Sequence, residues 1–335
     1  MTEAAPLVSV LLPVRNGGHF FAPALDSILD QQGVTFETVV IDDGSMDGTA
    51  DMLRQRARPG LVVVRRNGEG LVTALNAGLA VARGRLIARM DADDIALPGR
   101  LAAQAQMLDT DPALVMVHSA AELIDEHGRS IGTLAAQQGS PAERLQILLD
   151  ERYGPPIVHP TVMMRVDVLR RIGGYRDCPH AEDHELWLRL LAHGQFHGME
   201  QPLLRYRQHA GGVSRQKLAE ARATHMLNCV AWRYQHQTGV DLYAQDPAQY
   251  AWLRRQVERE LAENGSFSVV GPQLRQAVRK RQIGTALRIA ATHWQQLPVL
   301  LSNQRIRSNW LEMERRLVAL LAQAPAAGPD TGISR

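Results

Sequence analysis

The first part of the chain alternates short apolar runs with segments whose apolar residues recur every three or four positions. Continuous apolar runs predict buried strands, and the wider spacing predicts helices. The predicted strands are Leu7–Val14, Phe36–Ile41, Leu61–Val64 and Leu86–Met90, and a helical segment follows each of the first three. This alternation is typical of an α/β fold, in which a mostly parallel central sheet is covered by helices on both faces.

The pattern between residues 101 and 214 is mixed. It predicts a helix after Leu101, a strand near Leu114–Val117, a polar hairpin at Asp125–Arg129 and a second helix. We expect residues 157–164 to form a short extended segment, and Leu203–Arg207 to form a strand before a glycine-containing loop.

From residue 214 the pattern becomes helical, with helices predicted at 214–236, 247–264, 272–295 and 306–321. We therefore expect an α/β domain at 1–214, a helical C-terminal region at 215–321 and a tail at 322–335. The proline, glycine and alanine content of the tail predicts disorder. In the last helix, alternating steps of four and three predict a packing seam, suited to the helical region itself or to a homodimer: Ile306, Trp310, Met313, Leu317 and Leu320.

Composition adds limits on the protein's surroundings. With 335 residues and 45% hydrophobic content, the chain can bury a sizeable core. Two cysteines without metal-ligand or disulfide spacing suit a reducing compartment. The N-terminus carries an acidic residue where a signal peptide carries basic ones, and no apolar run reaches spanning length, so we expect a cytoplasmic protein.

Charge is divided unevenly along the chain. The net charge of +2 combines −4 in residues 1–219 with +6 in residues 220–335. A basic stretch in the predicted third helix suits either a solvated helical surface or peripheral association with the inner, anionic face of the cell membrane: Arg275, Arg279, Lys280, Arg281 and Arg288. Nucleic acid is not an expected partner, because the candidate site is acidic and the basic stretch lacks interleaved aromatic residues.

Carboxylates follow two of the predicted strands directly. Asp42 and Asp43 end the second strand, and Asp91, Asp93 and Asp94 follow the fourth. Ligands of such sheets bind at the carboxyl ends of the strands, and carboxylates together with a substrate's phosphates are a usual Mg²⁺ or Mn²⁺ site. The alternative is two polar turns that cap helices. A nicotinamide site is disfavoured, because the turn after the first strand lacks G-x-G-x-x-G.

Three further positions carry candidate chemistry. Glu182 and Asp183 begin a predicted helix, where carboxylates either stabilise the helix dipole or present a rigidly held general base. His209, in the glycine-containing loop, is either solvated or a contact to a metal or diphosphate. His159 suits a structural or acceptor-site role better than that of a base.

An ordered series of motifs resembles family 2 glycosyltransferases of the GT-A fold, a Rossmann-like α/β architecture. The resemblance covers about residues 7–214 and not the helical C-terminus. Its motifs are Val8–Val14 with Asn16, Val40–Ser45 with Asp47, Asn67 with Gly70–Leu71, Ala74–Leu79, Ala88–Asp94 with Pro98 and Arg100–Leu101, His159–Thr161, Gly173–Tyr175, Glu182–Asp183 with Leu186–Arg189, and Tyr206–His209.

The resemblance implies roles for the matching residues. Asp43 is expected to accept a hydrogen bond from the nucleobase, Asp93 to bind Mn²⁺ or Mg²⁺, and Asp183 to be the general base, with Glu182 beside it near the acceptor. The metal ligands implied are Asp93, Asp91 and His209. The donor-contacting positions implied are Pro13, Arg15, Asp42, Asp43, Asn67, Asn76, Asp91, Ala92 and His209.

The function implied is metal-dependent, inverting transfer of a sugar from a nucleotide-diphosphate sugar to a hydroxyl of a glycan or glycolipid, in cell-surface polysaccharide or lipopolysaccharide synthesis. Arg15 stands where relatives often carry an aromatic residue, and a guanidinium can also stack on a pyrimidine, so UDP- and dTDP-sugars are the expected donors. The alternatives are a sugar nucleotidyltransferase, for which the loop after the first strand is a poor match, and a non-catalytic nucleotide-sugar or membrane-binding scaffold.

Overall fold

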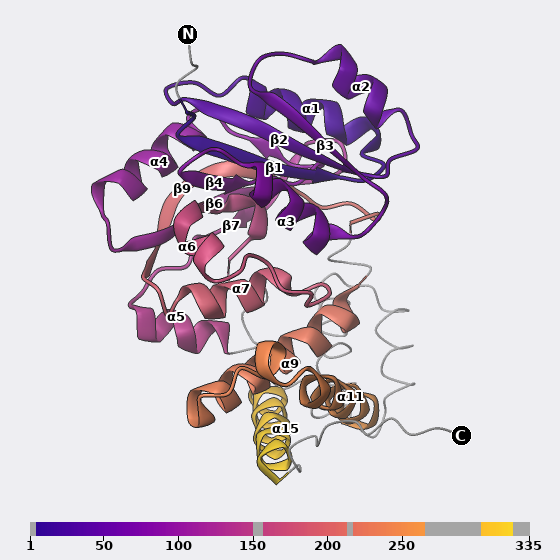
Figure 1. Ribbon diagram of the computed structural model, residues 1–335, viewed down its shortest axis with the longest axis vertical. Helices are drawn as coiled ribbons and strands as arrows, with labels where there is room; N and C mark the ends of the chain where they lie inside the picture. The colour runs from indigo at the N-terminus through magenta and orange to yellow at the C-terminus, as the bar shows by residue number, and fades with distance from the viewer. Residues whose placement is uncertain (1–4, 150–156, 213–216, 265–302, 324–335) are drawn as a thin grey trace. The chain divides into compact units, whose positions relative to one another are not determined.

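The computed structural model describes residues 5–149, 157–212, 217–264 and 303–323. The chain divides into two compact units. Unit 1 comprises Met1–Leu148, Pro155–Asp177 and Glu185–Gly212, and unit 2 comprises Leu149–Gly154, Cys178–His184 and Val213–Arg335. Unit 1 contains the sheet, and unit 2 is helical where it is described (Figure 1).

Unit 1 is built on a nine-stranded sheet of order β3-β2-β1-β4-β8-β6-β9-β5, with β7 paired to β6 (Figure 1). Strands β1 to β4 are mutually parallel and match the four predicted strands closely, and the order changes direction at β1, between β2 and β4. The strands are β1 Val8–Val14, β2 Phe36–Asp43, β3 Leu61–Arg66, β4 Leu86–Arg89, β5 Ile95–Ala96, β6 Leu114–Ile124, β7 Ser130–Leu134, β8 Met163–Arg165 and β9 Gln195–Arg207.

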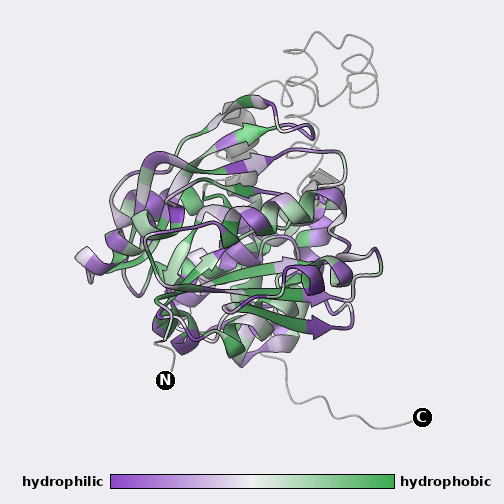
Figure 2. Cartoon of the chain, turned by 90° about the horizontal axis from the view of Figure 1, so that it is seen from above, coloured by the Kyte–Doolittle hydropathy of each residue, from purple (hydrophilic) through white to green (hydrophobic). Residues whose placement is uncertain are grey.

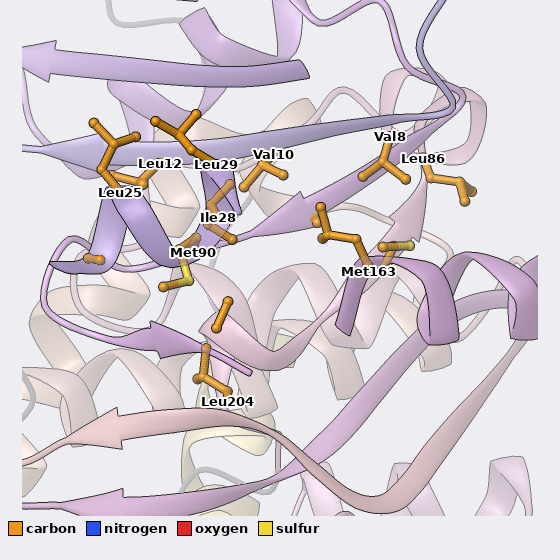
Figure 3. Close-up of a cluster of buried hydrophobic side chains, with 14 of the residues drawn as sticks. Val8, Val10, Leu12, Leu25, Ile28, Leu29, Leu86, Met90, Met163 and Leu204 are labelled. Carbon is orange, nitrogen blue, oxygen red and sulfur yellow. The ribbon is translucent and has the colours of Figure 1, made fainter. Parts of the chain in front are cut away.

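Strands β1, β2 and β4 are buried almost throughout, which explains why they are largely apolar, whereas the edge strand β3 is only partly buried. All seven residues of β1 are buried. The side chains packed around β1 include residues of the neighbouring strands and of the covering helix α1 (Figure 3). The hydropathy colouring shows the same concentration of apolar residues along these strands (Figure 2).

Close packing of a helix on the sheet requires a glycine in helix α3. A Cβ at Gly78 would lie 2.7 Å from Ile41 Cδ1, so the helix could not keep its distance from β2 with a larger residue there. The helices of this unit are α1 Gly18–Leu29, α2 Thr49–Gln55, α3 Leu71–Val81, α4 Arg100–Thr110, α5 Pro141–Leu148 and α6 Val166–Arg171. Helix α7, Glu182–Leu190, begins in unit 2 and continues into unit 1.

The second half of the sheet is mixed. Strand β8 is antiparallel to both β4 and β6, whereas β6 and β9 pair in parallel. The short strand β5 pairs antiparallel with β9, through Ile95 with Arg205 and Ala96 with Leu204. Because β5 directly follows Asp94, this pairing holds the acidic turn against the end of β9.

The segment expected to be extended at 157–164 differs in part. His159–Thr161 forms one turn of 3₁₀ helix, and only then does β8 begin. Pro160 stands in the first turn of this helix, where its fixed φ is favourable and its missing N–H costs nothing.

Unit 2 contains helices α9 Leu218–Thr238, α10 Leu242–Gln245, α11 Pro247–Asn264 and α15 Asn303–Gln323. Their apolar side chains form a separate cluster, to which α15 contributes Met313, Leu317 and Leu321. Within the chain Leu320 does not join the predicted seam: it is 43% exposed, and the buried residue after Leu317 is Leu321, a step of four rather than three. The side chains of Ile306 and Trp310 lie outside the described residues. Among the described residues, no helix is both long and apolar enough to cross a membrane.

Several predictions made for the C-terminal region lie outside the described residues. These are the helix at 272–295, its basic stretch at 275–288, and most of the tail at 322–335. Peripheral membrane association and a homodimer stay predictions.

Candidate active site

Two loops at the carboxyl edge of the sheet are joined by hydrogen bonds. The Asn16 amide donates to Ser45 Oγ at 2.9 Å, and Asn16 Oδ1 accepts from the Met46 amide at 2.8 Å. Asn16 has φ +52°, a conformation that asparagine tolerates better than most residues. The Gly18 amide donates to Asp47 Oδ2 at 2.9 Å. The turn after β1 is therefore fixed to the turn after β2.

Asp43, at the end of β2, organises the next loop. Its Oδ1 accepts from the amides of Gly68 and Glu69 at 3.1 and 2.8 Å, and its Oδ2 accepts from Gly70 at 2.8 Å. A carboxylate offers about four acceptor positions, so one remains on Oδ2 for an additional donor. The carboxyl group is 95% buried in this loop (5% exposed), which fixes its orientation.

Asp42 and Arg15 border the same loops. Asp42 Oδ1 accepts from the Ser45 amide at 2.9 Å, and Arg65 Nη2 lies 3.4 Å from Asp42 Oδ2. Arg15 is exposed, and its guanidinium passes over Gly68, where a Cβ would come within 3.3 Å of Nη2. The guanidinium is thus available at the surface, next to the loop that Asp43 holds.

The turn after β4 brings three carboxylates together. One oxygen each of Asp91, Asp93 and Asp94 lies within 4.8 Å of the others. Asp93 is the most accessible of the three, with a side chain 34% exposed, and its Oδ2 is 2.9 Å from His209 Nε2. The structure therefore assembles the residues predicted to bind metal, including His209 from beyond β9.

Asp94 is the most deeply placed member of this cluster. It is fully buried; Oδ1 accepts from the Arg207 amide at 2.8 Å, and Oδ2 has no hydrogen-bond partner among the described residues. Burial, followed by the charges of Asp91 and Asp93, raises the pKa of Asp94 well above its ordinary value. Binding of a cation to a buried carboxylate oxygen that accepts no hydrogen bond is strongly favourable.

Two buried arginines offset part of the negative charge. Arg89 forms an ion pair with Asp91, and burial raises the pKa of Asp91 although the Arg89 charge opposes this rise. Arg100, also fully buried, donates from Nη2 to the Arg89 carbonyl at 2.7 Å. Burial lowers the pKa of Arg100 to about 10, so it stays charged at neutral pH. Sequence reasoning gave neither arginine a role.

The end of β9 closes one side of the acidic turn. Arg207 Nε donates to the Asp93 carbonyl at 2.7 Å, and its guanidinium lies 4.6 Å from the centre of the Phe20 ring. The Phe20 ring also contacts the His209 ring, with 4.9 Å between centroids. The apolar periodicity of a helix gives no signal that Phe20 lies between the Arg207 guanidinium and the His209 imidazole.

Four further positions expected to contact the donor are Pro13, Ala92, Asn67 and Asn76. Pro13 is buried in β1 beside Ile41, and Ala92 lies within the acidic turn. Asn67 is half-buried and directly precedes Gly68 in the loop held by Asp43. The Asn76 amide bonds the Tyr175 backbone, donating to its carbonyl at 2.8 Å and accepting from its N–H at 2.9 Å. Asn76 thereby joins α3 to the turn at Gly173–Tyr175.

The candidate base stands at the start of α7, in unit 2. Asp183 Oδ1 accepts from the His184 amide at 2.7 Å, and Glu182 is buried. In unit 1, His159 is buried and its Nε2 is 3.0 Å from the Tyr175 hydroxyl. Burial, with a smaller effect of Arg89, lowers the pKa of His159 well below its ordinary value, which suits the structural role predicted for it.

The sequence of the chain is similar to those of known proteins. Residues 9–173 match the sequence profile of Glycosyl transferase family 2. The domain that contains these residues belongs to that family. The putative glycosyltransferase EpsE of Bacillus subtilis is 29% identical over 223 residues, which are 64% of this chain and 77% of that protein. An uncharacterized glycosyltransferase of Haemophilus influenzae is 28% identical over 223 residues, 63% of this chain and 68% of the relative.

Solved structures show the fold of this glycosyltransferase to be GT-A. The mannosyltransferase PcManGT from Pyrobaculum calidifontis, in complex with GDP-Man and Mn²⁺, aligns with a TM-score of 0.52 and 20% identity, over 96% of this chain and 87% of its own. TarS 1–349 of S. aureus in complex with UDP-GlcNAc aligns with a TM-score of 0.58 and 16% identity, over 94% and 91%. The predicted α/β class and the helical C-terminal region are confirmed.

Proposed function

We propose that this glycosyltransferase uses a divalent cation, Mn²⁺ or Mg²⁺, to transfer a sugar from a nucleoside-diphosphate sugar with inversion. The observation that carries the proposal is the grouping of the Asp94 carboxylate with those of Asp91 and Asp93, together with the buried Oδ2 of Asp94, which has no hydrogen-bond partner among the described residues. Hard carboxylate oxygens fit Mg²⁺ and Mn²⁺, so the residues present suit the metal that the fold family uses.

The donor side follows from the residues of unit 1. The residues that would hold the cation are Asp93, Asp91 and His209. The bound cation would neutralise the charge that develops on the departing diphosphate. The remaining acceptor position of Asp43 suits an N–H of the nucleobase, and the Arg15 guanidinium suits stacking on a pyrimidine. We therefore infer a UDP- or dTDP-sugar as donor.

The acceptor side needs one carboxylate. Asp183 would take the proton of the acceptor hydroxyl as that oxygen attacks the anomeric carbon on the face opposite the departing phosphate. Its place in the first turn of α7 gives it a rigid backbone, and Glu182 is its neighbour near the acceptor. We propose a hydroxyl of a cell-surface glycan or glycolipid as the acceptor; this rests on the family resemblance.

The family match favours glycosyl transfer over the two alternatives considered from sequence, the sugar nucleotidyltransferase and the non-catalytic scaffold. A panel of UDP-, dTDP- and GDP-sugars, each with Mn²⁺, with Mg²⁺ and with EDTA, tests the proposal through thermal shift and donor hydrolysis. We expect one donor to raise the melting temperature only when metal is present. A panel in which no donor shifts or turns over with either metal would overturn it.

A further inference from the structure

A second group of metal-ligating side chains lies in unit 2, apart from the carboxylates described above. Ligand atoms of His184, His225 and Cys229 lie within 4.8 Å of one another. All three residues belong to unit 2, so their grouping is internal to one compact body. Neither the family match nor the proposed function uses His225 or Cys229.

The three positions have a spacing that suits one ion. His225 and Cys229 are four residues apart in α9 and therefore share a helix face, while His184 comes from the first turn of α7. In a tetrahedral zinc site, bonds of about 2.0 Å to nitrogen and 2.3 Å to sulfur place ligand atoms roughly 3.3–3.6 Å apart. Separations of at most 4.8 Å are close enough for side-chain rotation to complete this geometry.

The imidazole rings define the rotation required. The rings of His184 and His225 stack with centroids 3.9 Å apart and planes inclined at 25°. A metal lies in the plane of each imidazole that binds it, so one ring has to turn about its Cβ–Cγ bond. His225 is the less buried of the two and is the ring we expect to move.

The three side chains lie in largely buried surroundings. Cys229 is fully buried and His184 is 5% exposed, which shields a metal–thiolate bond from water. Asn228 Nδ2 donates to the Ala181 carbonyl at 3.1 Å and lies 3.4 Å from His184 Nδ1, so His184 has a polar neighbour outside the three ligands.

The donor set also selects the metal. A thiolate and two imidazoles favour Zn²⁺, whereas the carboxylate oxygens of Asp91, Asp93 and Asp94 favour Mg²⁺ or Mn²⁺. We propose that His184, His225 and Cys229 bind one Zn²⁺ ion that joins the first turn of α7 to α9. Because His184 directly follows Asp183, the ion fixes the backbone that carries the candidate base. The inference concerns structure and does not depend on the proposed reaction.

Metal analysis of the full chain tests the site without any variant. Protein purified without chelator is incubated with Zn²⁺, desalted and measured by inductively coupled plasma mass spectrometry. We expect about one tightly held zinc per chain, and a melting temperature that falls when a zinc chelator is added. Replacement by Co²⁺ is expected to give the intense visible bands of a tetrahedral site and a thiolate charge-transfer band in the near ultraviolet. Less than a tenth of an equivalent of zinc, with no cobalt spectrum, overturns the proposal.

Matched variants locate the ion. Cys229→Ser and His225→Gln are expected to lose the bound zinc and the thiolate band or its tetrahedral form, with circular dichroism confirming that each variant is folded. Cys178→Ser, which changes the other buried thiol of unit 2, and His180→Gln are expected to retain both. Asp93→Ala is also expected to retain the zinc. Zinc retained by folded Cys229→Ser, or lost from Asp93→Ala, overturns the assignment.

Discussion

A buried carboxylate oxygen that accepts no hydrogen bond raises the free energy of the folded state, and Asp94 has such an oxygen. The adjacent carboxylates add repulsion, which Arg89 and Arg100 offset only in part. The same oxygen becomes favourable once a cation is bound. Asp94 is therefore expected to decrease stability in the absence of metal and to increase metal affinity.

Asp94→Asn tests whether this carboxylate lowers the stability of the metal-free protein. The pKa of Asp94 in the folded state is raised above its ordinary 3.8, so the folded state holds a proton that the unfolded chain releases, and the free energy of unfolding falls as the pH rises through and beyond 3.8. Asparagine does not ionise. In EDTA at pH 7 we expect the variant to unfold with a free energy about 1–3 kcal/mol higher than that of the wild type.

Urea titrations at pH 7 and at pH 4 measure this difference, which should shrink at the lower pH. With Mn²⁺ present, the wild type should gain stability and Asp94→Asn should gain less. Asp109→Asn, at a half-exposed position of α4, serves as the control and should change neither value. Equal or lower stability of Asp94→Asn at pH 7 in EDTA would contradict the role given to Asp94.

At the scale of single elements, the proposed donor site depends on hydrogen bonds between the turn after β1 and the turn after β2. Asp47, at the start of α2, accepts from the Gly18 amide at 2.9 Å and from the Thr49 hydroxyl and amide. The Thr49 hydroxyl is the largest cause of the lowered pKa of Asp47, so the carboxyl group is ionised throughout the neutral range. The side chain thus positions the turn that carries Arg15.

Asp47→Ala should loosen that turn and weaken donor binding without altering the chemistry. Asp47 is exposed, so the loss of its hydrogen bond with the Gly18 amide is expected to cost about 0.5–1.5 kcal/mol, which corresponds at most to a rise in donor KM of roughly 2- to 10-fold. Steady-state kinetics should show kcat nearly unchanged. Asp51→Ala, in the first turn of α2, removes only an exposed ion pair with Arg54 and should leave KM as in the wild type. A loss confined to kcat would instead place Asp47 in the chemical step.

Helix α15 offers a similar comparison in unit 2. Leu317 is fully buried in the helical cluster, whereas Leu320, three residues on, is 43% exposed. Leu317→Ala should lower the free energy of unfolding of this unit by about 2–4 kcal/mol, because it leaves a cavity. Leu320→Ala should change it by less than about 0.5 kcal/mol. Urea unfolding followed by circular dichroism distinguishes the two, and similar losses would mean that α15 presents both residues to a partner.

At the scale of the whole molecule, the four parallel strands could be predicted because each contains a continuous apolar run bounded by polar turns, although β3 is only partly buried. The pairing of β9 with β6 joins segments about 80 residues apart, and no local periodicity encodes it. The same applies to the site. The carboxylates of Asp42 and Asp91 follow their strands directly, whereas the contacts of Asp94 with Arg207, and of Phe20 with His209, depend on that long-range pairing.

The proposed reaction assigns separate tasks to Asp93 and Asp183. Asp93→Ala should abolish the metal-dependent thermal shift caused by the donor, because it removes the most accessible carboxylate of the cluster. Asp183→Asn should keep that shift and lose turnover by at least about 100-fold, because proton transfer by a positioned base contributes about 10²–10⁴-fold to rate. Thermal shift and product formation, measured on the same preparations with the donor found by the panel, give both values. If Asp183→Asn lost the shift as well, its carboxylate would be a determinant of donor binding. If it kept full turnover, another group would have to remove the acceptor proton, and the assignment of the base would fail while the metal site at Asp93 stood.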